Sequence, residues 1–262
     1  MKKLLTVVLL AAVLVTVLSA QGASESAAPM SAVERIKKAG VIKVATGTYV
    51  PFEYRDENNN IVGYDIDFAQ LVADKLGVKL EVSDMVFQTI IPAIEQGQYD
   101  FAIAAMYDTA ARREVVLMSD SYYETGMILT VPAGNPKGIK TLADCAGLKV
   151  GVKAGATSQV EAEKAMEQYG VKYEIIGYEE TIGCVSDLEA GRVDVVVNDL
   201  LNQLELCKTH PMVEIVGEPF THASLACAVK MGDDDLLAVI NEVIAEYKAD
   251  GTMDALTEKW LK

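Results

Sequence analysis

Apolar and polar positions follow two alternating patterns along the first half of the chain. Short strand-like apolar runs alternate with stretches of helical spacing, in the order Val41–Ala45, Asp65–Leu76, Lys79–Val82, Thr89–Gln96 and Phe101–Ala104. In Asp65–Leu76 the apolar residues Phe68 and Val72 share one helical face, Asp65 is the expected N-cap, and Gly77 is the expected terminator. Such alternation predicts a mostly parallel sheet with helices on its faces.

A second series of the same kind follows Pro132. Its predicted strands are Lys149–Val152, Lys172–Ile176 and Val193–Val197, and its predicted helices are Ser158–Tyr169, Thr181–Ala190 and Leu200–Cys207. Further strands are expected at Val213–Val216 and Ser224–Val229, and two final helices at Leu236–Lys248 and Met253–Leu261. The two series predict two α/β units.

The N-terminal segment has the pattern of an export signal. Lys2 and Lys3 precede an unbroken run of apolar and small residues from Leu4 to Ala20, which predicts a signal peptide over residues 1–22. Residues 23–30 are rich in Ala and Ser and predict a flexible leader. The cleavage position stays open, and an uncleaved membrane anchor is the alternative. We expect the protein in the periplasm or another extracytoplasmic space.

The charge balance narrows the range of partners. Of 262 residues, 38 are Asp or Glu against 23 Lys or Arg, for a formal net charge of −15. Such acidity repels phosphate backbones, so nucleic acid is not an expected partner. After the first segment no apolar run is long enough to span a bilayer.

Cysteine and histidine give few candidates for reactive chemistry. The four cysteines, Cys145, Cys184, Cys207 and Cys227, form an even set that permits two disulfides in an exported chain, with three pairings open. No CxxC pair or Cys/His spacing indicates a metal, and the two histidines, His210 and His222, lie in no motif. We therefore expect no metal, no cofactor and no catalytic residue.

Charged groups of both signs follow the predicted strands. The segments just past strand ends are Thr46–Tyr49, Ala105–Arg112, Lys153–Ser158 and Asn198–Asp199, and open α/β sheets bind ligands at that edge. Arg112 offers a planar fork for a carboxylate, while Asp199 offers acceptors for an ammonium group. A zwitterion would satisfy both.

The helix after Lys153–Ser158 offers a second anion site. Ser158 and Glu161 have the spacing of a capping box, and free amide groups at a helix start attract anions. An ordinary capped helix is the simpler alternative.

Several ordered motifs make the chain resemble a known family. YVPFEY at 49–54 precedes GYDIDFA at 63–69, and TAARREVV at 109–116 precedes the tyrosines at 122–123; AGRVD at 190–194 and ADGT at 249–252 follow. Over roughly residues 33–262 the sequence is similar to the polar amino-acid family of periplasmic solute-binding proteins. The resemblance implies an α/β, two-lobed type II periplasmic-binding-protein fold with two hinge crossings.

The resemblance also implies domain boundaries and a function. Lobe 1 is expected at residues 31–122 plus 226–262, lobe 2 at 127–221, and the hinge strands at 123–126 and 222–225. The expected protein is a monomer that captures a polar α-amino acid and delivers it to the permease of an ABC importer.

Site roles follow from the same resemblance. Arg112 and Thr157 would bind the ligand carboxylate, whereas Asp199 and the Ala105 carbonyl would bind its ammonium group. The remaining side-chain roles are an aromatic sandwich of Tyr49 and Phe87 and a side-chain pocket of Lys153, Asn198, Gly47 and Tyr107.

Two positions depart from the family pattern. Tyr107 stands where a Thr or Ser is usual, so either its backbone alone serves the ligand or the pocket is reshaped. Gly47 lies in a segment one residue shorter than in many relatives, where an acid often meets cationic side chains. These changes favour neutral, glutamine-like or acidic ligands over lysine or arginine.

Two other functions use the same scaffold. An enzyme such as a cyclohexadienyl dehydratase would need a pocket acid that is not occupied by an ammonium group. A ligand-sensing partner of a receptor would use the same pocket as a transport protein.

Overall fold

The computed structural model describes residues 30–262, and residues 31–262 form one compact unit. The expected signal peptide and the leader up to residue 29 lie outside the described residues. Within residues 30–262, no helix combines the length and apolar character needed to span a membrane.

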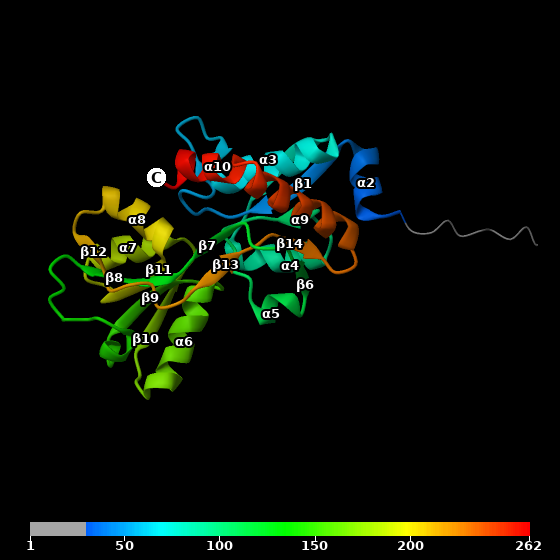
Figure 1. Ribbon diagram of the computed structural model, residues 1–262. Helices are drawn as coiled ribbons and strands as arrows, with labels where there is room; N and C mark the ends of the chain where they lie inside the picture. Colours follow the sequence, from blue (N-terminus) through cyan, green and yellow to red (C-terminus); the bar gives the residue numbers. More distant parts are fainter. Residues whose placement is uncertain (1–29) are drawn as a thin grey trace, which may run out of the picture. The chain divides into compact units, whose positions relative to one another are not determined.

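The first sheet has five strands in the order β4-β1-β5-β14-β6. Strands β1, β14 and β6 of this sheet are labelled in Figure 1. Their bounds are β1 Val41–Thr46, β4 Lys79–Asp84, β5 Phe101–Ala102, β6 Val116–Met118 and β14 Ala228–Lys230. Strand β1 pairs in parallel with β4 and β5, whereas β14 is antiparallel to β5 and β6. The last strand of this sheet therefore comes from the C-terminal part of the chain.

Helices cover both faces of this sheet. They are α2 Ala32–Ala39, α3 Tyr64–Leu76, α4 Ile90–Glu95, α5 Ala110–Arg113, α9 Asp234–Ala249 and α10 Thr252–Trp260, with a short 3-10 turn at Phe87–Thr89 and a hairpin of β2 Tyr54–Arg55 and β3 Ile61–Val62. Val44 of β1 packs in one cluster with Phe68 of α3, while the next residue, Ala45, packs in another cluster with Ile90 of α4. The strand alternation thus places α3 and α4 on opposite faces.

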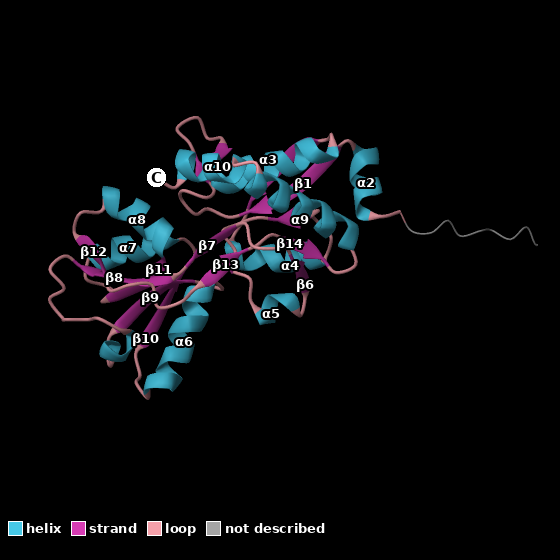
Figure 2. Ribbon diagram, viewed as in Figure 1, coloured by secondary structure: helices cyan, strands magenta, loops and turns pink. Residues whose placement is uncertain are grey.

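The second sheet repeats this arrangement in the order β10-β9-β11-β8-β12 (Figure 2). Its strands are β8 Met127–Pro132, β9 Lys149–Lys153, β10 Glu174–Tyr178, β11 Val195–Asp199 and β12 Val213–Val216, and its helices are α6 Thr157–Tyr169, α7 Thr181–Glu189 and α8 Leu200–Thr209, with a 3-10 turn at Leu142–Cys145. Val195 clusters with Ala162 of α6, whereas Val196 clusters with Val185 of α7. Helices again cover both faces.

Two short strands lie where the chain passes between the sheets. Strand β7, Tyr123–Thr125, follows the first sheet, and β13, Ala223–Leu225, follows the second; they pair antiparallel. Two α/β sheets joined by two crossings confirm the fold class predicted from sequence. The exact lobe and hinge boundaries stay predictions.

Both expected N-caps are wrong, whereas Gly77 ends helix α3 in the left-handed conformation, as predicted. Helix α3 starts at Tyr64 after Gly63, and Asp65 lies inside its first turn with a buried carboxylate. Gly63 has φ 137°, and an added Cβ there would lie 2.1 Å from the Phe52 carbonyl oxygen, so only glycine fits.

Helix α6 likewise starts one residue earlier than expected. Its N-cap is Ala156, which makes no side-chain capping bond, and Ser158 is buried in the first turn. Glu161 bonds to Lys164 instead of forming a capping box.

Some elements were shifted or missed. The expected strand Ser224–Val229 is interrupted at Ala226 and Cys227, because the chain there crosses from β13 to β14, and the strand expected at Lys172–Ile176 is β10, two residues later. Helix α2 and strand β8 were not predicted; α2 buries only Ala32 and Ile36. The four cysteines are free thiols, so the permitted disulfides are not formed.

Candidate functional site

A pocket is lined by residues from both sheets. The first sheet and its loops contribute Tyr49, Phe87, Ala104, Ala105, Tyr107 and Arg112, and the second contributes Met127, Lys153, Ala156, Thr157, Ser158, Asn198 and Asp199. Every predicted site residue except Gly47 is in this set. Gly47 lies behind Phe87, where an added Cβ would be 3.8 Å from the ring.

Asp199 ends strand β11 and caps helix α8. Its Oδ1 accepts from the Leu201 amide at 2.9 Å, and its Oδ2 accepts from the hydroxyls of Tyr107 and Thr125, both at 2.7 Å. The residue is 2% exposed, and burial raises the pKa of its carboxyl, against the opposing effect of those hydrogen bonds. No cationic side chain within residues 30–262 forms an ion pair with it.

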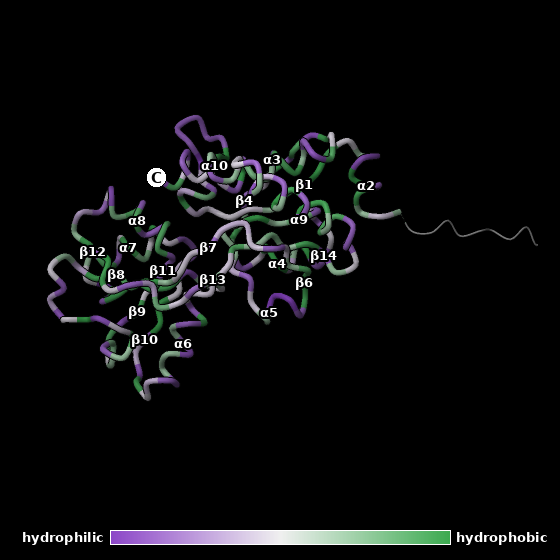
Figure 3. Tube along the Cα trace, in the orientation of Figure 1, coloured by the Kyte–Doolittle hydropathy of each residue, from purple (hydrophilic) through white to green (hydrophobic). Residues whose placement is uncertain are grey.

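Arg112 is a half-buried cation without an anionic partner among the described residues. It lies in α5, a hydrophilic helix in Figure 3. Its Nη1 donates to the Tyr107 carbonyl at 2.6 Å, and its Cζ lies 5.5 Å from the Phe87 ring centroid. Burial lowers the pKa of Arg112 to about 10. The adjacent Arg113 is instead exposed and paired with Asp108 at 2.6 Å.

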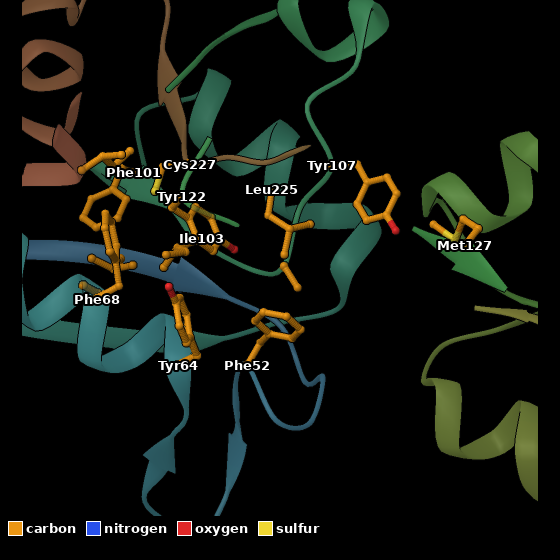
Figure 4. Close-up of a cluster of buried hydrophobic side chains, with 14 of the residues drawn as sticks. Phe52, Tyr64, Phe68, Phe101, Ile103, Tyr107, Tyr122, Met127, Leu225 and Cys227 are labelled. Carbon is orange, nitrogen blue, oxygen red and sulfur yellow. The ribbon is translucent and has the colours of Figure 1, made fainter. Parts of the chain in front are cut away.

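Tyr107 connects these two charged groups. Its carbonyl accepts from Arg112, and its hydroxyl donates to Asp199, which belongs to the other sheet. In Figure 4 its ring points toward Met127, also from the second sheet. The Tyr107 side chain therefore spans the pocket from the first sheet to Asp199 of the second.

Lys153 contributes a second cation to the site. Its side chain is 4% exposed, and its Nζ donates to the Thr48 carbonyl at 2.9 Å and lies 3.2 Å from Glu180 Oε2. The same Nζ is 4.9 Å from the Tyr49 ring centroid and 5.2 Å from that of Phe87. Cation–π attraction holds the ammonium group between the two aromatic rings.

Asn198 fixes one wall of the pocket. Its Oδ1 accepts from the Tyr49 hydroxyl at 2.5 Å, and its Nδ2 donates to Asn202 Oδ1 at 2.7 Å and Gln203 Oε1 at 3.1 Å. Its amide is thus already used within the protein. Sequence reasoning missed the lining residues Ala104 and Met127, because small or apolar residues carry no chemical signal. Ala156 and Ser158 also line the pocket and fall within the candidate segment Lys153–Ser158, but no ligand contact was assigned to either.

The charges of these groups suit a small dipolar solute. A cation on one sheet and an anion on the other each lack an ionic partner in the described part of the chain, and both are partly or fully removed from water. Uncompensated buried charge is costly, so a ligand with opposite charges at its two ends would be bound favourably.

Two α/β sheets, two crossings and a pocket shared by both halves define a two-lobed solute-binding protein. The family model of bacterial extracellular solute-binding proteins, family 3, matches residues 42–262. The chain belongs to this family, as its motifs predicted.

Individual relatives agree with the family. The L-cystine-binding protein TcyJ of Escherichia coli K12 is 30% identical over 228 residues, covering 86% of this chain and 84% of that protein. An ancestral arginine-binding protein solved with arginine is 40% identical, with a TM-score of 0.80 over 85% of this chain and 99% of that one. The ancestral amino-acid-binding protein AncCDT-1, a precursor of cyclohexadienyl dehydratase, is 34% identical, with a TM-score of 0.81 over 88% and 100%.

Proposed function

We propose that this protein captures a polar α-amino acid between its two lobes, outside the cytoplasm, and delivers it to an ABC importer as a monomer. The observation that carries the proposal is a pair of charges, Arg112 and Asp199, that have no ionic partner among residues 30–262 and lie on opposite sides of one pocket. The ligand carboxylate would bind Arg112 and the start of α6 at Thr157. Its ammonium group would bind Asp199 and the Ala105 carbonyl.

The side-chain preference is for neutral or acidic amino acids. Lys153 presents its ammonium between Tyr49 and Phe87, the rings proposed to flank the ligand side chain. A carboxamide or carboxylate can accept a hydrogen bond from this ammonium, whereas a guanidinium or second ammonium would repel it. This proposed preference differs from the arginine bound by the ancestral arginine-binding protein. The ligand screen must therefore include arginine.

Closure around the ligand follows from the two-lobed arrangement. We propose lobe 1 at residues 31–122 plus 226–262 and lobe 2 at 127–221, with β7 and β13 as the hinge. A ligand that bonds both lobes favours the closed state, because it interacts with groups that only closure brings together.

The experiment is a thermal-shift and calorimetric screen of the mature protein with glutamine, glutamate, cystine and arginine. A ligand at 100 times its Kd should add about 2.7 kcal/mol to stability. Arg112→Ala should abolish the shift, while Arg113→Ala, one residue further and paired at the surface, should retain it. Absence of any shift, or equal shifts in both variants, would refute the proposal; a preference for arginine would refute the side-chain assignment alone.

An enzyme is the second candidate, favoured by the similarity to AncCDT-1. Such an enzyme needs an acid in the pocket that can give up a proton. Among the described residues, Asp199 is the one acid that lines the pocket, and three donors already bond to its carboxylate, which disfavours the enzyme. Turnover of prephenate or arogenate by the purified protein would establish it instead.

A further inference from the structure

Two buried carboxyl groups lie next to the pocket but do not line it. Glu53 precedes β2, Asp65 lies in the first turn of α3, and both are 0% exposed. Asp65 Oδ2 accepts from the Ala105 amide at 2.7 Å and from the Tyr122 hydroxyl at 3.1 Å. Within residues 30–262, Asp65 Oδ1 and both Glu53 oxygens have no hydrogen-bond donor.

One proton accounts for these unpartnered oxygens. The Glu53 and Asp65 carboxyl groups lie within hydrogen-bonding reach of each other. Two ionised carboxylates so placed and out of water repel each other strongly, so one of them binds a proton. A neutral Glu53 can donate that proton to Asp65 Oδ1, which leaves Asp65 ionised and able to accept from the Ala105 amide. Burial raises the pKa of both groups, that of Asp65 to about 6 and that of Glu53 well above its usual range, where the neighbouring Asp65 raises it further.

Other titratable groups around the pair leave Glu53 neutral and Asp65 ionised. Lys153 of β9 lowers the pKa of Glu53, but its effect is smaller than that of burial or of Asp65, and Glu180 at the start of α7 raises it. The remaining neighbours are the side chains of Tyr49, Tyr64, Tyr122 and Cys227, all of whose own pKa values are raised, so they stay neutral.

The Ala105 backbone shows what the pair supports. Ala105 has φ 43°, a left-handed conformation that costs a residue with a side chain about 1–2 kcal/mol. It is the one pocket-lining residue with a positive φ, and in the described part of the chain no donor bonds to its carbonyl oxygen. Strain of this kind persists where surrounding contacts enforce it, and the enforcing contact is the bond from its amide to Asp65.

We infer that Asp65 is a positioning residue for ligand binding: it holds Ala105 in the left-handed conformation that presents its carbonyl to the ligand ammonium group, and neutral Glu53 holds Asp65. The inference rests on the proposed amino-acid-binding function. It assigns this role to two carboxyl groups that never touch the ligand.

The test compares Asp65→Ala, Asp65→Asn and the control Asp67→Asn. Asp67 lies two residues further along the same helix, where it pairs with Lys259 at 2.7 Å, away from the pocket. The Kd is measured by calorimetry for the amino acid that gives the largest thermal shift and for its des-amino analogue, which lacks the ammonium group.

Asp65→Ala should weaken binding of the amino acid by about tenfold or more, because the Ala105 amide loses its acceptor. The des-amino analogue should be affected much less. Asp65→Asn restores an acceptor and should recover most of the affinity, and Asp67→Asn should bind as wild type does. If Asp65→Ala loses affinity equally for both ligands, or for neither, the inference is overturned while the proposed function stands. If the wild-type protein binds no amino acid, the proposed function fails and the inference fails with it.

If Asp65→Ala does not fold, the Glu53→Gln variant tests the inference instead. Infrared spectra at neutral pH should show a protonated carboxyl band in wild type that is missing in Glu53→Gln. The Glu53→Gln variant should also keep its ligand affinity, because its amide N–H replaces the acid O–H as donor to Asp65. Identical spectra, or a large loss of affinity in Glu53→Gln, would overturn the inference.

Discussion

Replacing Asp199 by asparagine separates the binding role of this residue from its effect on stability. The substitution keeps the shape and removes the charge. The asparagine oxygen can still accept from the Leu201 amide at the start of α8, and the hydroxyls of Tyr107 and Thr125 can rotate to accept from its amide group. Loss of the charged acceptor should weaken binding of the ligand ammonium group by about 3 kcal/mol, or roughly a hundredfold in Kd.

The ligand-free protein should respond in the opposite direction. Burial raises the pKa of Asp199 in the folded state above its usual 3.8. The Asp199 carboxyl therefore stays protonated to higher pH in the folded protein than in the unfolded chain. Its contribution to the free energy of unfolding is greatest below pH 3.8 and falls as pH rises through the folded-state pKa. At pH 7 the buried carboxylate lowers the stability of the ligand-free fold, and asparagine removes that cost.

The assay is thermal unfolding at pH 7, with and without the best ligand, together with calorimetric titration. We expect Asp199→Asn to unfold at or above the wild-type temperature without ligand and to lose most of the ligand-induced shift. Asp187→Asn is the control: Arg192 holds the pKa of half-buried Asp187 below its usual range, so this change should slightly destabilise the fold at pH 7 and leave Kd unaltered. Wild-type affinity in Asp199→Asn, or a clear drop in its ligand-free unfolding temperature, would refute the reasoning.

Two further predictions concern specificity and the core. Lys153→Met keeps the length of the side chain but removes the ammonium between Tyr49 and Phe87. The ratio of glutamate to arginine affinity should therefore fall by about tenfold. An unchanged ratio in competition titrations would contradict the side-chain assignment. Phe68→Ala empties a fully buried site under the first sheet and should lower the free energy of unfolding by about 3–5 kcal/mol in urea titrations, whereas a cost under 1 kcal/mol would show that the core there is loosely packed.

The charged ends of the site could be found from sequence because their positions follow a simple rule. Arg112 and Asp199 lie past or at the carboxyl ends of strands, and such strand ends gather at one edge of an α/β sheet. The link between them could not be found. Tyr107 was recognised as unusual, but only the folded chain shows that its hydroxyl reaches Asp199, 92 residues away along the sequence.

Contacts that are distant along the chain or hidden in buried runs also explain why two fold predictions failed. Strand β8 is an apolar run buried on both faces, and periodicity cannot distinguish such a run from other buried segments. Asp65 was predicted as an N-cap because acids are common at helix starts. Its actual partner, the Ala105 amide, lies 40 residues away, and no local pattern signals a contact of that range.

The hydrogen bonds within the site also indicate which of its two charged ends binds the ligand more strongly. Three protein donors already bond to the Asp199 carboxylate, so a ligand ammonium group competes for acceptor sites that are partly satisfied. The Arg112 guanidinium has five N–H donors and, within residues 30–262, bonds only to the Tyr107 carbonyl. A ligand carboxylate therefore satisfies groups that otherwise lack partners. The carboxylate end should be the stronger anchor, and loss of the Arg112 guanidinium should cost more affinity than loss of the charge on Asp199.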